Sequence, residues 1–188
     1  MIDNGELKLG TVYSETKISK MLNISRTPFR SALNRMAQDG FIDILPSRGF
    51  VLHEMTQSEF FDYIDMLCAL EEYAVRSCAV DPAKRADLLG RIKTVHSQMQ
   101  SGNDPRFHEL NNQFHATLIQ VSRNLVINRK YHNMKYLMMT QYASKCFDDT
   151  DRKKIIDDHT RLIEMISSGK LDTVSELMNK HLHFELET

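Results

Sequence analysis

Three histidines stand at spacings that place their imidazole rings on the apolar faces of three separate helices. His115 follows Asn111 by four residues, so both lie on one side of an expected helix. His159 and His181 each continue the apolar stripe of a later helix, at the spacing of a buried face. Three inward imidazoles from one helical bundle can bind a cation such as Zn, Ni, Cu or Fe(II). The same spacing also fits three core histidines bonded to backbone carbonyls, and spacing alone favours that second interpretation.

A second group of residues with possible chemistry lies near the N-terminus. Arg26 and Arg30 are four residues apart on an expected helix, where they can contact guanine edges or phosphates. The free N–H groups at the start of that helix favour phosphate. Arg48, in an expected turn, can reach a neighbouring groove or the DNA backbone. Solvent-exposed arginines would look the same in isolation, but the surrounding elements favour DNA contact. The candidate DNA-binding residues are Ser25, Arg26, Thr27, Arg30, Arg48 and Gly49.

Two short helices and a hairpin position these arginines. Residues 14–22 form an expected helix with Ser14 as its N-cap, and a second helix runs from about Ser25 to Gly40. Two apolar stretches, 41–45 and 50–52, flank Pro-Ser-Arg-Gly, which predicts a β-hairpin. This order predicts a winged helix-turn-helix domain over residues 1–53.

The remainder of the chain carries helical periodicity only. Thr56 and Glu59 form a capping box that opens a long helix to about residue 79. Asp-Pro pairs at 81–82 and 104–105 begin further helices. The expected helices cover 56–79, 82–100, 105–122, 124–146, 151–167 and 172–186. The predicted fold is therefore mainly α, with the winged helix followed by an all-α domain of about six helices over residues 56–188.

Composition excludes several classes of protein. The chain has 188 residues, no apolar run long enough for a transmembrane helix and no secretory signal in its first ten residues. Its three cysteines form no CxxC pair and lack the basic neighbours that activate a thiol, so a reducing cytoplasm is the expected compartment. Residues 1–53 carry seven Lys/Arg and five Asp/Glu, a balance of +2, and residues 54–188 carry 17 and 20, a balance of −3. A basic N-terminal segment followed by an acidic C-terminal segment suggests that the N-terminal segment binds a polyanion.

The first part of the chain resembles the winged-helix domain of GntR-family bacterial transcription regulators. The segment SRTPFRSAL, followed by Gly-Phe and Pro-Ser-Arg-Gly-Phe, carries the resemblance. It implies a homodimer that binds a short palindromic operator. Such domains normally open with a further helix, and only about ten residues precede the Gly10-Thr11 stretch. We therefore expect that first helix to be missing, which puts tight DNA binding in question.

The helical part resembles the FCD effector domain of one GntR subgroup, through NNQFHATLIQVSRN and DHTRLIEMISSGKLDTVSELMNKHL. The resemblance implies a divalent metal, most often Zn or Ni, bound by an Asp and a His four residues apart and by one His from each of two later helices. The matching positions are Asn111, His115, His159 and His181. An amide is a poorer ligand than a carboxylate, so we expect weaker metal binding than in relatives with Asp.

The resemblance also implies a small carboxylate effector beside the metal. An Arg is usual four residues before the Glu of a Leu-Glu pair, but Leu67 stands there, before Leu70-Glu71. An organic acid is therefore less firmly implied, and the pocket residues stay unassigned. The sequence offers Arg91, Lys135, Tyr136, Gln141 and Tyr142 as candidates without ranking them.

The sequence is compatible with three functions. The first is a ligand-responsive regulator that binds DNA, and it explains the charge division, the hairpin and the histidines together. The second is a helical metal-dependent hydrolase, but only Glu109 and Asp158 are nearby as bases, and both are expected on solvent-facing sides. The third is a sensor dimer that no longer binds DNA, favoured by the missing first helix. We expect the first.

Overall fold

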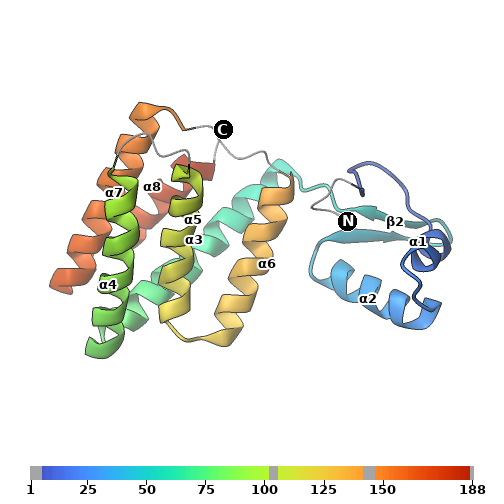
Figure 1. Cartoon of the computed structure of the whole chain (residues 1–188), viewed down its shortest axis with the longest axis horizontal. Coiled ribbons are helices and arrows are strands. Elements are labelled where there is room, and N and C mark those ends of the chain that lie inside the picture. Colours follow the sequence, from blue (N-terminus) through green and yellow to red (C-terminus); the bar gives the residue numbers. More distant parts are fainter. Residues whose placement is uncertain (1–5, 102–105, 142–146, 187–188) are drawn as a thin grey trace. The chain divides into compact units, whose positions relative to one another are not determined.

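The computed structural model describes residues 6–101, 106–141 and 147–186 (Figure 1). These residues form a mainly helical protein with one two-stranded antiparallel hairpin, as the sequence predicts. The chain divides into two compact units, one that ends at Phe60 and also takes the end of α6, and one that takes most residues from Phe61 onward. The elements are α1 (Glu15–Met21), α2 (Arg26–Gln38), β1 (Ile42–Leu45), β2 (Gly49–Leu52), α3 (Gln57–Ala79), α4 (Pro82–Met99), α5 (Phe107–Val121), α6 (Leu125–Gln141), α7 (Asp149–Ser168) and α8 (Val174–Leu186).

The first unit folds around one small apolar core. Helix α1 packs on α2, and α2 packs on β1. Ser14 caps α1 through its side chain, which accepts a hydrogen bond from the Lys17 backbone N–H, so the predicted N-cap is confirmed. Strands β1 and β2 pair with Ile42 opposite Leu52, close to the predicted hairpin. The buried core residues are Leu7, Ile18, Phe29, Leu33, Ile42, Phe50 and Leu52.

A short backbone bridge joins the hairpin to the segment before α1. The Tyr13 N–H donates to the Phe50 carbonyl at 2.8 Å, and the Phe50 N–H donates back to Tyr13 at 3.0 Å. Gly49, beside this bridge, has a φ of +119°, and a Cβ atom built on it would overlap the Tyr13 carbonyl oxygen. Both the conformation and the close approach therefore require glycine at this position.

The second unit is a bundle in which α4 packs against α5 and α7, and α7 packs against α8 (Figure 1). The predicted capping signals at Thr56 and Asp81 are confirmed, and the Asp-Pro pair at 104–105 lies outside the described residues. Thr56 accepts from the Glu59 N–H, while the Glu59 carboxylate accepts from the Thr56 N–H at 2.8 Å. Asp81 caps α4 just before Pro82. Helix α7 begins two residues before the predicted start, because Asp148 caps it in a capping box with Asp151.

Two further expectations concern the cysteines and the membrane. Cys68 and Cys78 are buried free thiols, and Cys146 lies outside the described residues. Burial, with help from the nearby Glu71 carboxylate, raises the pKa of Cys68 to about 12, so this thiol stays protonated and unreactive. Among the described helices, none has the length and apolar character that a membrane span needs.

Replacing Gly49 with Ala tests the packing of the hairpin on the Tyr13 segment. The substitution forces an unfavourable φ and a backbone overlap, so we expect a loss of at least about 1–3 kcal/mol in the free energy of unfolding of the first unit. Gly90→Ala is the matched control, because Gly90 lies inside α4 with open space around it. That change should stabilise the helical unit by about 0.5–1 kcal/mol. Urea unfolding followed by circular dichroism measures both, and equal midpoints for Gly49→Ala and the parent would contradict the described bridge.

Candidate functional site

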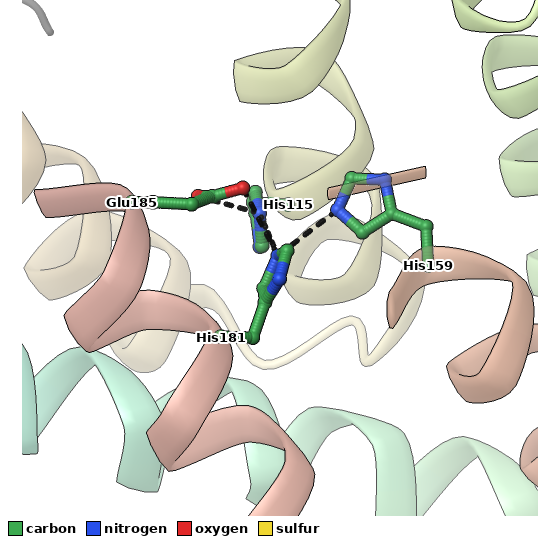
Figure 2. Close-up of side chains that lie close together, drawn as sticks. All are labelled: His115, His159, His181 and Glu185. Carbon is green, nitrogen blue, oxygen red and sulfur yellow. Dashed lines mark hydrogen bonds and ion pairs between the residues drawn. The ribbon is translucent and has the colours of Figure 1, made fainter. Parts of the chain in front are cut away.

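Four side chains from three helices converge inside the helical unit. His115 comes from α5, His159 from α7, and His181 and Glu185 from α8. Their exposed fractions are 0%, 0%, 2% and 3%. Each residue offers one ligand atom, and these four atoms all lie within 4.8 Å of one another. The four side chains point toward a common centre (Figure 2). We call these four residues the histidine cluster.

Four of the six separations inside the histidine cluster are close to the edge length of a tetrahedral metal site. The Nε2 atom of His181 lies 3.1 Å from Nε2 of His159 and 3.3 Å from Nε2 of His115. The oxygens of Glu185 lie 3.2 Å from Nε2 of His115 and 3.0 Å from Nε2 of His181. Ligands at the usual zinc distances of about 2.0–2.2 Å are separated by about 3.3–3.6 Å in a tetrahedron. A modest expansion of the cluster would therefore hold such an ion.

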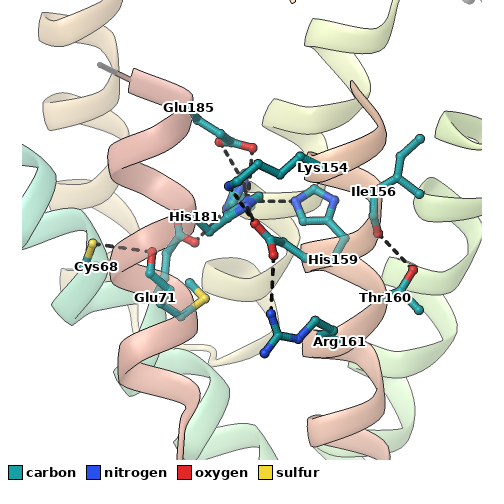
Figure 3. Close-up of polar contacts among 12 residues, drawn as sticks. Cys68, Glu71, Lys154, Ile156, His159, Thr160, Arg161, His181 and Glu185 are labelled. Atoms are coloured by element: carbon teal, nitrogen blue, oxygen red, sulfur yellow. Dashed lines mark hydrogen bonds and ion pairs between the residues drawn. The ribbon is translucent and has the colours of Figure 1, made fainter. Parts of the chain in front are cut away.

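Outer carboxylates orient two of the rings. The Nδ1–H of His115 donates to Oε2 of Glu71 at 2.7 Å, and Glu71 is completely buried. Nδ1 of His181 lies 3.4 Å from Oδ2 of Asp158, within the polar network drawn in Figure 3. A carboxylate on Nδ1 fixes the ring and leaves the Nε2 lone pair to face the ligand, which is the usual arrangement around metal-bound histidine. Both Nε2 atoms face the centre of the histidine cluster.

The charges of the cluster are strongly coupled. Burial by itself lowers the pKa of His115, but the carboxylates of Glu71 and Glu185 outweigh it and raise the pKa to about 10. Burial lowers the pKa of His159 far below its ordinary value, and the positive charges of His181 and His115 lower it further. Burial opposes ionisation of Glu185, yet the two neighbouring imidazoles outweigh it and hold its pKa well below the ordinary value. In the metal-free protein His115 therefore carries a positive charge between two carboxylates.

The contacts distinguish this cluster from ordinary core histidines. His96 is such a core residue, since its Nε2 lies 3.2 Å from the Ile156 carbonyl oxygen. In the described part of the chain, the rings of His115, His159 and His181 contact carboxylates or one another instead. His159 is also held by stacking on Phe114, with ring centroids 3.7 Å apart and planes 7° apart. The Nε2 atoms of the three rings face one another, while stacking on Phe114 and the carboxylates at Nδ1 of His115 and His181 help to hold the rings in place.

Sequence reasoning identified part of this arrangement and missed the rest. Asn111 is buried one turn before His115, and its Oδ1 has no hydrogen-bond partner within the described residues. Glu185 was not expected, although its position four residues after His181 on one helix face was available as a signal. The prediction that Asp158 faces solvent is wrong, because its side chain is 13% exposed and contacts His181. Glu109 is exposed, as expected.

The donor set fits a divalent transition metal. Imidazole nitrogen suits Zn, Ni, Cu and Fe(II), and one carboxylate oxygen is a common fourth ligand. Both oxygens of Glu185 are buried and face imidazole nitrogens, 3.2 Å from His115 and 3.0 Å from His181, so they could bind a cation shared with these rings. The residues present therefore fit a metal ion.

The predicted DNA-binding residues lie on the surface of the first unit. Arg26, Thr27 and Arg48 are exposed, and Gly49 is partly exposed at the start of β2. Arg30 is 70% exposed, with its Nε 3.7 Å from the Glu15 carboxylate. Ser25 occupies the N-cap position of α2, and its side chain makes no capping hydrogen bond there. The start of α2 thus presents backbone N–H groups beside an arginine.

The candidate effector residues that the structure describes lie on two helices, α4 and α6. Arg91 is exposed on α4 and Tyr136 is exposed on α6, Lys135 is half-buried, and Tyr142 lies outside the described residues, as does the side chain of Gln141. Leu67 is fully buried on α3. An effector pocket built from these candidates stays a prediction.

The chain matches two protein families and is similar to several transcription regulators. Residues 62–184 match the FCD domain family, and residues 1–52 match the family described as bacterial regulatory proteins, gntR family. The chain is 23% identical to the Nta operon transcriptional regulator of Aminobacter aminovorans, over 94% of this chain and 84% of that protein. It is 25% identical to the gluconate operon transcriptional repressor of Bacillus licheniformis, over 97% of this chain and 76% of that one. The fold is similar to that of E. coli McbR/YncC, with a TM-score of 0.63, 16% identity, and coverage of 97% of this chain and 88% of the other.

Replacing His159 with Ala tests whether the cluster binds metal. We expect zinc uptake to be lost while the helical content is retained, because one of three imidazole ligands is removed from a buried site. Elemental mass spectrometry of zinc-loaded, desalted protein measures the uptake. His183→Ala is the control: His183 lies two residues from His181 but contacts Asp65, 3.2 Å from its Nε2, outside the cluster. Unchanged zinc content in His159→Ala would contradict the assignment.

Proposed function

Since the chain belongs to the GntR family of bacterial regulatory proteins and carries an FCD domain, it is a bacterial transcription regulator, and we propose that it binds a palindromic DNA operator as a homodimer under the control of a ligand in its helical unit. The matched families and the curated relatives are regulators and not enzymes. The alternative of a metal-dependent hydrolase is therefore set aside. The convergence of four buried ligand atoms in the histidine cluster is the observation that carries the ligand part of the proposal.

The metal in this proposal is a divalent transition ion, with Zn or Ni preferred. His115, His159 and His181 would hold it, together with Glu185. Asn111 stays a candidate through its unpaired Oδ1, either as a weak ligand or as the residue that positions a water molecule. A small organic acid is the proposed effector, because a carboxylate oxygen is a good ligand for a divalent transition metal.

Two observations support the proposed homodimer: the family resemblance and the exposed apolar side chains on one side of α3. Met66 and Tyr73 lie seven residues apart on one side of α3 and are 53% and 49% exposed. Ala69, between them, is exposed, and Leu70 is only partly buried. A stripe of exposed apolar side chains on a long helix is typical of a helix–helix interface. A second copy of the chain would cover this stripe and supply the second DNA-binding unit that a palindrome requires.

Control of DNA binding follows from this arrangement. Ligands from α5, α7 and α8 would be joined by one ion, so binding changes how firmly these helices are held together. In a dimer, such a change alters the distance between the two DNA-binding units and thereby the affinity for a palindrome of fixed spacing.

Arg26→Ala tests the proposed DNA surface. The probe is a duplex selected by the parent protein from a random-sequence pool, and a mobility shift measures affinity. Loss of a bidentate base contact should weaken binding by about 1–3 kcal/mol. Arg91→Ala removes one positive charge from the helical unit and is the control, with near-parental affinity expected. Equal affinity of Arg26→Ala and the parent would remove Arg26 from the DNA surface, and failure of the parent to select any duplex would favour the sensor that does not bind DNA.

Tyr73→Asp tests the proposed dimer. A buried negative charge opposite its own copy should convert the dimer to monomer at micromolar concentration. Sedimentation velocity measures the change, with Gln113→Asp, an exposed position on α5, as the control. A Tyr73→Asp protein that sediments as the parent does would exclude this face of α3 from the interface.

A further inference from the structure

Helix α8 supplies two members of the histidine cluster from adjacent turns, His181 and Glu185. Glu185 contacts one histidine of another helix and one of its own: Oε2 lies 3.2 Å from Nε2 of His115 on α5, and Oε1 lies 3.0 Å from Nε2 of His181 on α8. Its side chain is 2% exposed, and neither oxygen has a hydrogen-bond partner among the described residues. The carboxylate of Glu185 is thus aimed at the centre of the cluster, where it faces the Nε2 atoms of His115 and His181 (Figure 2).

Charge explains why this carboxylate matters. A divalent ion held by three neutral imidazoles keeps its full double charge in a buried place, which is unfavourable. Asn111, on the neighbouring turn before His115, is neutral and cannot reduce that charge. Glu71 and Asp158 are already engaged with the Nδ1 atoms of His115 and His181. Among the cluster members Glu185 is the only anion, so it is the residue that balances the ion.

The number of protein ligands decides whether the metal site is open or closed. Zinc sites with four protein ligands are closed, whereas sites with three leave one position for water or another molecule. The histidine cluster contains four ligands at near-tetrahedral spacing, and all four are buried. A carboxylate from outside the chain therefore finds the metal fully coordinated.

We propose that Glu185 is the anionic fourth ligand of the metal and that it occupies the position an organic-acid effector must take, so that effector and Glu185 compete for one coordination site. This inference rests on the proposed metal-binding function of the helical unit. An effector at that position would separate Glu185, in the last turn of α8, from His115 of α5, while His181 would keep its contact with Asp158. Glu185 would therefore compete with the effector for binding to the metal.

The test uses Glu185→Ala with acetate as the probe. Removal of even an outer partner of a metal ligand lowers affinity by about 10–100-fold, so loss of a direct ligand should lower zinc affinity at least about tenfold, measured by competition with a chromophoric chelator. Acetate should recover part of this loss in Glu185→Ala and should leave the parent unchanged. In the cobalt-loaded proteins, millimolar acetate should shift the visible absorption of Glu185→Ala and not that of the parent. Glu176→Ala, an exposed glutamate on the same helix, is the control and should behave as the parent.

Two further variants, Glu185→Gln alone and combined with Asn111→Asp, distinguish loss of a ligand from misfolding because both substitutions preserve side-chain shape. Glu185→Gln preserves the shape of the side chain and should also lower zinc affinity, and Asn111→Asp added to it should recover at least part of the loss by returning a negative charge next to His115. Zinc affinity unchanged in both Glu185→Ala and Glu185→Gln would overturn this inference alone. Acetate that shifts the cobalt spectrum of the parent as readily as that of Glu185→Ala would show an open position and would also overturn it. A parent protein that binds neither zinc nor cobalt would overturn the metal site itself, and this inference with it.

Discussion

The constraint on which the helical unit depends is the burial of three imidazoles and two carboxylates in one small volume, with a third carboxylate, Asp158, partly buried beside them. Buried charges are tolerated when they are paired, and His115 lies between Glu71 and Glu185 for that reason. Without a metal ion, a proton on His115 supplies the positive charge that these carboxylates need. A divalent cation would supply the same charge from the centre of the cluster. Proton and metal would therefore be alternative occupants of one electrostatic arrangement.

Apolar packing makes this polar cluster possible. His159 stacks on Phe114, and residues of the same α7 stripe, Ile155, Leu162 and Ile166, are almost fully buried around it. Helix α7 begins at a capping box and ends at Gly169, which adopts a left-handed conformation, so its register is defined at both ends. The position of each imidazole thus follows from helix boundaries and side-chain packing that are set outside the cluster.

The predictable part of the structure is the part governed by local rules. The caps at Ser14, Thr56 and Asp81, the hairpin around Gly49 and the inward faces of the helices all follow from short-range spacing. Glu185 was missed because a glutamate four residues after a histidine looks the same whether it faces solvent or another helix. Glu71 and Asp158 were missed for a related reason: their roles depend on how α3, α5, α7 and α8 are placed side by side, which one sequence does not specify. The DNA-binding residues remain predictions, since the structure places them on the surface without a nucleic acid.

X-ray absorption at the zinc edge of the zinc-loaded protein identifies the atoms that bind the ion and so tests whether the histidine cluster is a metal centre. We expect one zinc ion per chain with a first shell of nitrogen and oxygen only, at about 2.0–2.2 Å, including the multiple-scattering signature of three imidazoles. A sulfur-containing shell, a shell with fewer than two imidazoles, or no zinc retained after desalting would contradict it.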